Sequence, residues 1–393
     1  MTTVLVASDK FKGSLTAAQV AAAVSAGIRR VSSVPIVSVP VADGGDGTVD
    51  AAVSAGFERV PVTASGPTGE PVQTAYARRG DTAVIEMADV AGLVRLPGGV
   101  RQPLTATSRG LGEVMAAAID AGCTQLVVGI GGSASTDGGA GLVAALGASL
   151  LDAEGEQLPG GGAALERLDR VDLGALRSRL ESVNVTVASD VDNPLLGERG
   201  AAAVYGPQKG ASPDDVERLD AALAHWADVV EEVTGRDDRH HPGAGAAGGV
   251  GFGLVGVLGA RVRSGIDLLL ELVGFDAALA HLGPDDLVIT GEGSLDEQTL
   301  NGKAPAGVAA AAAARGVPVV AVCGRTTLDV ERLREAGIDA AYALADIEPD
   351  IRRCFTHAAA LLEQLGERVA RDRLAHKTTR SDDAVDTPKG ATP

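Results

Sequence analysis

A repeated order of short apolar run, glycine-rich loop and helix constrains the fold of this chain more than any other feature. The run Val4–Ala7 is followed by a loop and then by a helix that Ser14 or Thr16 can cap. A second run, Ile36–Val39, precedes the loop ADGGDGT and a helix over Thr48–Ala55. Strands that alternate with helices in this way predict an α/β fold with a parallel sheet.

The same order returns near the end of the sequence. Leu287–Thr290 is an apolar run, Gly291–Gly302 is expected to be a loop, and Pro305 lies at the start of an alanine-rich helix. Val317–Cys323 and Ala340–Leu344 predict two further strands, and a final helix is expected to reach about residue 374. The two ends of the chain therefore supply five candidate strands between them.

The middle of the sequence is less regular, and we expect it to form a second domain. If the first two and last three strands share one parallel sheet, residues 1–60 and 285–377 form a discontinuous domain. Residues 61–284 would then be an α/β domain inserted into it, an arrangement that surface loops tolerate. Residues 378–393 are polar and without periodicity, so we expect a disordered tail there.

The charge of the chain excludes some partners. There are 34 Lys and Arg residues against 52 Asp and Glu residues, which gives a net charge of −18, and no basic run occurs. A nucleic-acid-binding surface needs a basic face, so we expect no nucleic-acid partner. An anionic substrate would have to be held by local donors such as helix N-termini, a few lysines or a metal ion.

Cysteine usage and the N-terminus indicate a cytoplasmic protein. Cys123, Cys323 and Cys354 are far apart, and no CxxC or zinc spacing occurs, which fits a reducing compartment. The N-terminus lacks a basic region followed by an apolar run, and no segment approaches the roughly 20 apolar residues of a membrane span. We expect no membrane partner, and a monomer or a homodimer.

Acidic, glycine-rich loops follow four of the apolar runs: SDKFKGS, ADGGDGT, ASDVDNP and TGEGSLDEQT. Ligands of open α/β sheets bind outside the carboxyl ends of the strands, where carboxylates can bind Mg²⁺ or accept a proton. A single Asp in a loop is more often a helix cap or turn former, so it is the grouping that favours a site. The candidates are Asp9, Asp43, Asp46, Asp190, Asp192, Glu292 and Asp296.

Four lysines lie where they could hold phosphate. Lys10 and Lys12 are in SDKFKGS, Lys303 directly precedes a predicted helix, and Lys209 lies in GPQKGAS. A phosphate at a helix N-terminus beside a lysine is a favourable arrangement. A solvated surface position is the commoner place for a lysine and stays open as the alternative.

The glycine-rich segment Gly129–Ala134, GIGGSA, has two interpretations. It follows an apolar run, and Asp152 lies about 20 residues later, as in a dinucleotide-binding fingerprint. It could equally form a nest of backbone N–H groups for phosphate, and 52 glycines make chance matches expected. An NAD(P)-dependent oxidoreductase is therefore the alternative function. The sequence contains no Walker A motif and no protein-kinase motif set.

Seven blocks carry a more specific signal, and they occur in this order: SDKFKGSLTAAQ, VADGGDGT, GIGGSASTDGG, ASDVDNPLLGERGAA, YGPQKGAS, GAAGGVGFGL and TGEGSLDEQTLNGKAPAGVA. Together they resemble the signature blocks of the bacterial-type glycerate kinases, a family of glycerate 2-kinases. The resemblance extends from about Val4 to Leu365.

This resemblance implies a two-domain fold in which the discontinuous domain is flavodoxin-like. It also implies an ATP-dependent phosphotransferase that acts on an alcohol group of an organic acid, with ATP and Mg²⁺ as cofactors. The acceptor would be D-glycerate, a small molecule, and the product 2-phosphoglycerate.

Phosphoryl transfer depends on positioning and charge neutralisation, and we assign the expected roles from that chemistry. The catalytic candidates are Asp190, Asp43 and Lys10; the ATP-binding candidates are Lys12, Gly131, Gly132, Ser133, Glu292, Asp296 and Lys303; the metal-binding candidates are Asp46 and Asp192. Which carboxylate takes the proton and which bind the metal is left open by the sequence.

Overall fold

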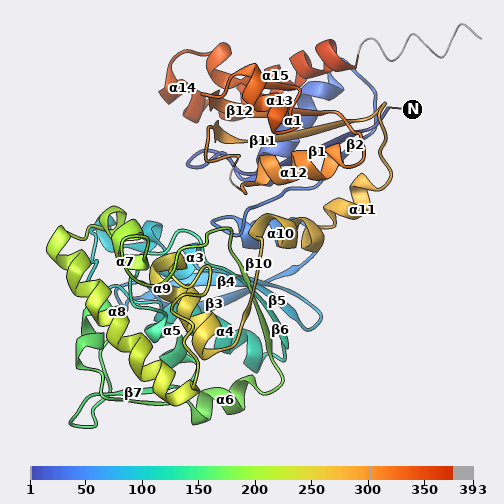
Figure 1. Cartoon of the computed structure of the whole chain (residues 1–393). Coiled ribbons are helices and arrows are strands. Elements are labelled where there is room, and N and C mark those ends of the chain that lie inside the picture. The colour runs from blue at the N-terminus through green and yellow to red at the C-terminus, as the bar shows by residue number, and fades with distance from the viewer. Residues whose placement is uncertain (1, 301, 375–393) are drawn as a thin grey trace, which may run out of the picture. The chain divides into compact units, whose positions relative to one another are not determined.

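The chain divides into two units in the computed structural model, which describes residues 2–300 and 302–374 (Figure 1). The first unit contains the chain up to Pro40 and the chain from Gly274 onward, and the second unit is Val41–Val273. Residues 378–393, for which we expected disorder, lie outside the described residues.

The first unit is built on a five-stranded sheet in which all strands are parallel. Its spatial order is β13–β12–β11–β1–β2, which is the flavodoxin-like order for strands counted along this unit. The expected sheet of two N-terminal and three C-terminal strands is thus confirmed. The strands are β1 (Val4–Ser8), β2 (Ile36–Ser38), β11 (Leu287–Leu295), β12 (Val319–Thr326) and β13 (Ala340–Ala343).

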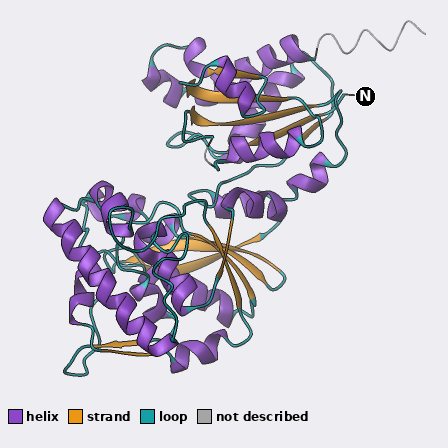
Figure 2. Cartoon of the chain, viewed as in Figure 1, coloured by secondary structure: helices purple, strands orange, loops and turns teal. Residues whose placement is uncertain are grey.

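Helices cover both faces of this sheet (Figure 2). On one face, α1 (Ala17–Arg29) and α15 (Ala358–Arg373) pack with alternate strand residues such as Val4 and Val6. On the other face, α12 (Ala304–Ala313) contacts β1, β11 and β12. The remaining helices of the unit are α11 (Phe275–Leu279), α13 (Val330–Glu335) and α14 (Ile351–Thr356).

The second unit contains a six-stranded mixed sheet of order β10–β9–β6–β5–β4–β3. The first four strands of that order are parallel, and β4 and β3 are antiparallel to their neighbours through the expected turns at GPTGE and RRGD. The strands are β3 (Glu58–Ser65), β4 (Pro71–Arg79), β5 (Thr82–Glu86), β6 (Gln125–Gly129), β9 (Asn184–Ala188) and β10 (Arg261–Arg263).

Two cores flank this second sheet. The larger lies between one face and α4 (Arg109–Asp120), α5 (Ala140–Ala145) and α8 (Pro213–Thr234), and the smaller lies under α2 (Thr48–Ser54) and α10 (Gly265–Val273). The shorter elements of the unit are α3 (Ala88–Ala91), β7 (Ser149–Leu151), β8 (Arg170–Asp172), α6 (Gly174–Leu180), α7 (Ala201–Tyr205) and α9 (Ala246–Phe252).

The boundaries between the units differ from those expected at residues 60/61 and 284/285. Residues 41–60 belong to the second unit because α2 buries Val49 and Ala52 against Val84 of its sheet. Residues 274–284 belong to the first unit, where α11 contacts β1.

Strand β11 is longer than expected. We predicted a loop from Gly291, but the strand continues to Leu295 and pairs with β12 as far as Thr326. Gly291 lies against the Val322 carbonyl oxygen, which a Cβ would overlap, so a glycine lets the two strands approach there. The apolar run therefore marks only the first part of this strand.

The first unit also contains a close crossing of two helices. A Cβ at Gly27 of α1 would overlap the carbonyl oxygen of Glu363 in α15, and a Cβ at Gly366 would overlap that of Val24. Glycine at these positions lets the two backbones touch, at the cost of its low helix propensity.

We predict that Gly27→Ala destabilises the protein although alanine is the better helix former. The new methyl group has to push α1 from α15, and such overpacking costs about 1–3 kcal/mol of unfolding free energy. Urea unfolding measures it. Gly283→Ala is the matched control, because a Cβ there meets nothing within 4 Å. Equal stability of the two variants would contradict the close contact.

Candidate functional site

The carboxyl ends of β5, β6 and β9 lie on one edge of the second sheet because these strands are parallel. The loop that contains Asp43 and Asp46 lies across this edge. A Cβ at Gly129 would lie 2.5 Å from the Gly44 carbonyl oxygen, and a Cβ at Gly131 2.7 Å from the Gly45 Cα. Glycine on β6 and after it is what lets the loop come this close.

The two predicted catalytic carboxylates, Asp43 and Asp190, meet at this edge. The N–H of Gly265, at the start of α10, donates to Asp190 Oδ1 over 2.9 Å. A Cβ on Gly265 would lie 2.8 Å from Asp190 Oδ2 and would overlap the Asp43 carbonyl oxygen. Asp43 Oδ1 accepts from the Gly45 N–H over 3.0 Å, which fixes that side chain within its own loop.

The environment of Asp190 disfavours its charge. The residue as a whole is exposed, but its carboxylate packs against the start of α10, and this partial burial raises the pKa of Asp190. Hydrogen bonds from Ser264 and Gly265 oppose the rise in pKa, and the negative charge of Asp43 adds to it. A carboxylate in such surroundings is a better proton acceptor than one in water.

Glu86, which our sequence analysis missed, holds the Asp43–Asp46 loop in place. It is the last residue of β5 and is buried, and its carboxylate accepts from the N–H groups of Gly47 (3.0 Å) and Val49 (3.1 Å). A carboxylate at the start of α2 satisfies backbone donors that have no partner within the helix. The position of Glu86 at a strand end was the one available sequence signal.

The ATP-binding candidates Gly131, Gly132 and Ser133 lie at the same edge, in the turn after β6. Lys209 supports this turn from inside: its Nζ donates to Ser133 Oγ over 2.8 Å and to the Ser135 carbonyl oxygen. Lys209 is 1% exposed, so the solvated position that we kept open for it is wrong. Its place in GPQKGAS gave no signal of burial.

A second cluster forms in the first unit around Glu292. Thr299 Oγ1 donates to Glu292 Oε1 over 2.5 Å, and Lys303 Nζ lies 3.9 Å from Glu292 Oε2. Lys303 is the residue directly before α12, whose first N–H groups have no partners within the helix. Asp296 shapes the same loop, since its N–H donates to Thr299 Oγ1. Three ATP-binding candidates are therefore brought together here.

The candidates of the first loop lie beside β11. The Asp9 N–H donates to the Gly291 carbonyl oxygen over 2.8 Å, and the Lys10 N–H donates to Asp9 Oδ1 over 2.6 Å. The Lys12 side chain is exposed in the turn that follows. The backbone nitrogen of Lys12 lies 3.6 Å from where a Cβ on Gly293 would be. The backbone of this turn thus runs along β11 near Glu292.

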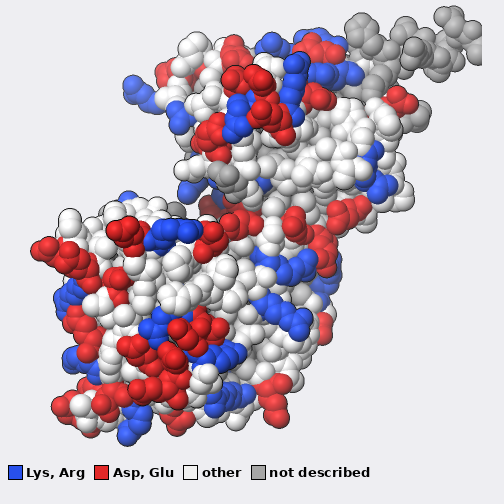
Figure 3. Space-filling view, in the orientation of Figure 1, with Lys and Arg blue, Asp and Glu red and all other residues white. Residues whose placement is uncertain are grey.

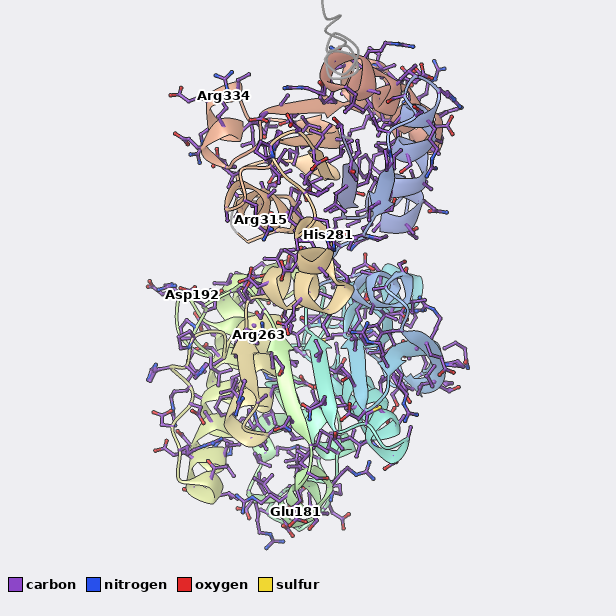
Figure 4. The ribbon with its side chains drawn as sticks, turned by 90° about the vertical axis from the view of Figure 1, so that its right-hand side faces the viewer. Glu181, Asp192, Arg263, His281, Arg315 and Arg334 are labelled. Atoms are coloured by element: carbon purple, nitrogen blue, oxygen red, sulfur yellow. The ribbon has the colours of Figure 1, made fainter. Side chains whose placement is uncertain are left out.

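Asp192 does not join the pair formed by Asp43 and Asp190. Its side chain, labelled in Figure 4, is 77% exposed. One of its oxygens lies 3.2 Å from Arg199 Nη2. Asp46 lies in the same loop as Asp43. Across residues 2–300 and 302–374, no group of three or more His, Cys, Asp or Glu side chains is arranged to hold a metal ion.

The dinucleotide-binding interpretation of GIGGSA does not fit this geometry. Such a fingerprint opens a helix, and the pyrophosphate binds at the helix N-terminus. Here α5 begins only at Ala140, after a turn through Gly138 and Gly139 in left-handed conformations. The structure therefore removes the support for an oxidoreductase.

The surface is consistent with the low basic content of the sequence. Lys and Arg side chains lie scattered among Asp and Glu on the face drawn in Figure 3. Within the described ranges, no helix has the length and apolar character needed to cross a membrane.

Comparisons with known proteins agree with this fold. The model of the glycerate kinase family matches residues 4–374. A glycerate kinase of Bacillus subtilis is 44% identical over 95% of this chain and 98% of its own. A glycerate 2-kinase of Escherichia coli is 44% identical over 87% of this chain and 90% of its own. A crystal structure from Salmonella typhimurium LT2, described as a candidate glycerate kinase 2, has a TM-score of 0.82 at 39% identity, covering 96% and 99% of the two chains.

The fold and its acidic edges define a two-unit α/β protein whose discontinuous unit is flavodoxin-like. The chain belongs to the glycerate kinase family.

We predict that Asp190→Asn does not lower stability at pH 7. Because the folded pKa is raised, the Asp190 charge opposes folding above that pKa, and this cost disappears as the pH falls below the ordinary value of 3.8. Asparagine keeps the acceptor for the Gly265 N–H. Urea unfolding at pH 7 should give an equal or higher free energy of unfolding. Asp120→Asn, on a 66% exposed side chain, is the control. A clear loss of stability for Asp190→Asn alone would contradict the assignment.

Proposed function

We propose that this protein is a glycerate kinase that transfers the γ-phosphoryl group of ATP to D-glycerate and gives 2-phosphoglycerate. The pairing of Asp190 with Asp43 at the carboxyl edge of the second sheet carries this proposal within the family assignment. The names of the relatives from Bacillus subtilis and Escherichia coli support it.

Asp190 is our choice for the group that accepts the proton of the glycerate hydroxyl. Its pKa is raised by partial burial and by Asp43, which favours proton uptake. The Gly265 N–H donates to one carboxylate oxygen and so orients the side chain.

Mg²⁺ fits this donor set. Mg²⁺ is commonly bound by one or two carboxylates together with substrate phosphates, and Asp43 and Asp46 lie in one loop at this edge. When bound, the ion would neutralise charge on the transferring phosphoryl group. Asp192 has less support as a ligand, because its carboxylate pairs with Arg199.

The ATP phosphates need positive charge and N–H donors, which several candidates supply. Lys303 directly precedes α12 beside Glu292, and Lys10 and Lys12 lie in the first loop. The Gly131–Ser133 turn could hold a further anionic group of either substrate.

We also propose that the enzyme works in the cytoplasm, since its three cysteines are buried free thiols. We propose that it acts as a monomer or a homodimer.

A coupled assay of ADP release tests the activity. Purified protein with ATP, Mg²⁺ and D-glycerate should release ADP, and omission of D-glycerate or addition of a chelator should abolish the release. NAD(H) binding, measured by fluorescence, serves as the test of the alternative function. ADP release that does not depend on D-glycerate would contradict the proposal.

We predict that Asp190→Asn lowers kcat by two or more orders of magnitude, as expected when a general base is lost. The KM for D-glycerate should change much less, because the hydrogen-bonding shape of the side chain is kept. Asp120→Asn, exposed at the end of α4, should keep the wild-type rate. Near-normal turnover in Asp190→Asn would remove Asp190 from the chemistry.

A further inference from the structure

Lys209 is an ammonium group placed inside the core of the second unit. Besides its contacts with Ser133 and Ser135, its Nζ lies close to Gly248, 2.6 Å from where a Cβ on that residue would be. Burial of a charged amine costs free energy unless its hydrogen bonds compensate. A core built only for stability would place an apolar side chain here.

The loop that Lys209 contacts through Ser133 and Ser135 contains further buried polar groups. Ser135 Oγ and Thr136 Oγ1 are fully buried and have no hydrogen-bond partner in the described part of the chain. Such groups are rare in folded proteins and call for an explanation, such as a site of function. The polar character of this interior therefore extends beyond the ammonium group.

Asp137 interacts electrostatically with Lys209 but forms no ion pair with it. Its carboxylate is fully buried and accepts from the Ser108 N–H (2.8 Å), Ser108 Oγ (2.9 Å) and Thr107 Oγ1 (3.2 Å). Among the described residues, Lys209 forms no ion pair at salt-bridge distance. Asp137 is the charged group whose negative charge stabilises the protonated form of Lys209 and so opposes the fall in its pKa. The positive charge is thus left directed at the Ser133–Ser135 segment.

The backbone next to the Lys209 ammonium group, around Gly248, has an uncommon conformation. Ala247, Gly248 and Gly249 are consecutive left-handed residues with φ of 57°, 74° and 85°. A left-handed alanine costs free energy, and such strain clusters at functional sites. This segment places Gly248 against both Lys209 and the Ser135 carbonyl oxygen.

We propose that Lys209 is a positioning residue whose ammonium group holds the Gly131–Ser135 turn in the shape that binds an anionic substrate group, and adds positive charge behind that turn. This inference rests on the proposed function. The anion is the carboxylate of glycerate or a phosphate of ATP, and the two are distinguished by measuring each ligand separately.

The central test is Lys209→Met, which keeps the length of the side chain and removes its charge and donors. We expect the affinity for one ligand, D-glycerate or Mg²⁺–ATP, to fall at least about tenfold at pH 6.5, as loss of hydrogen bonds from a charged group implies. Calorimetric titration of each ligand measures this without turnover. Unchanged affinity for both ligands in folded protein would overturn the proposal.

A pH series tests the charge itself. Burial lowers the pKa of Lys209 to about 7, with Asp137 opposing the shift. The neutral form therefore dominates above pH 7, and wild-type affinity for the same ligand should fall between about pH 6 and 8.5. Lys209→Met should lack this dependence. If Lys209→Met does not fold, Ser133→Ala replaces it, because it removes one acceptor of the Lys209 ammonium group and should lower the affinity for the same ligand. Unchanged affinity in Ser133→Ala would overturn the proposal. A wild-type affinity that does not vary with pH for either ligand would overturn it as well.

Leu176→Ala is the control for general destabilisation. Leu176 is buried in the same core on α6, which precedes β9 and so lies at the opposite end of the strands from the turn. It should lower the melting temperature but leave the affinity for both ligands unchanged. An equal loss of affinity in Leu176→Ala would show that Lys209 is merely structural.

The outcomes also separate this proposal from the proposed function. Wild-type protein that binds a ligand in a Lys209-dependent manner, yet releases no ADP, would overturn the kinase activity alone. A wild-type protein with kinase activity that Lys209→Met retains with normal KM values would overturn the role of Lys209 alone. Wild-type protein that binds neither ligand would overturn both.

Discussion

The close backbone contact between the Asp43–Asp46 loop and the end of β6 is the constraint on which the candidate site of the second unit depends. Gly129 and Gly131 allow the backbone of Gly44 and Gly45 to lie where side chains would otherwise stand. This contact places Asp43 beside Asp190, and the Asp43 charge contributes to the raised pKa of Asp190. A side chain at Gly129 or Gly131 would push the Asp43–Asp46 loop away and separate the two carboxylates. The proposed proton transfer therefore depends on glycine at the end of β6.

The fold was predictable where its determinants are local. Apolar runs followed by helices predicted the five parallel strands, and Thr16 forms the expected cap of α1 with the Gln19 N–H. The boundaries were not predictable, because the apolar face of α2 does not reveal which sheet covers it. Strand β11 was shortened in our prediction because its second half, GEGSL, is polar and glycine-rich although it pairs with β12.

The candidate site was predictable only in part. Acidic loops after strands pointed to Asp43, Asp190 and Glu292. The structure places Asp43 and Asp190 at the carboxyl edge of the parallel strands of the second sheet, and Glu292 within β11 of the first. Glu86 was missed, and the burial of Lys209 was not foreseen, because a charged residue in a sequence gives no sign of being buried. Their partners, Val49 and Ser133, are distant in the chain, so only the folded structure shows these contacts.

The central claim is that this member of the glycerate kinase family phosphorylates D-glycerate, and the product itself tests it most directly. Phosphorus NMR of purified protein incubated with ATP, Mg²⁺ and D-glycerate follows every phosphorylated species in one experiment. The account predicts loss of the γ-phosphate signal and the appearance of one phosphomonoester signal that coincides with added 2-phosphoglycerate. A spectrum with no phosphoglycerate, or with the phosphate on another hydroxyl, would contradict it.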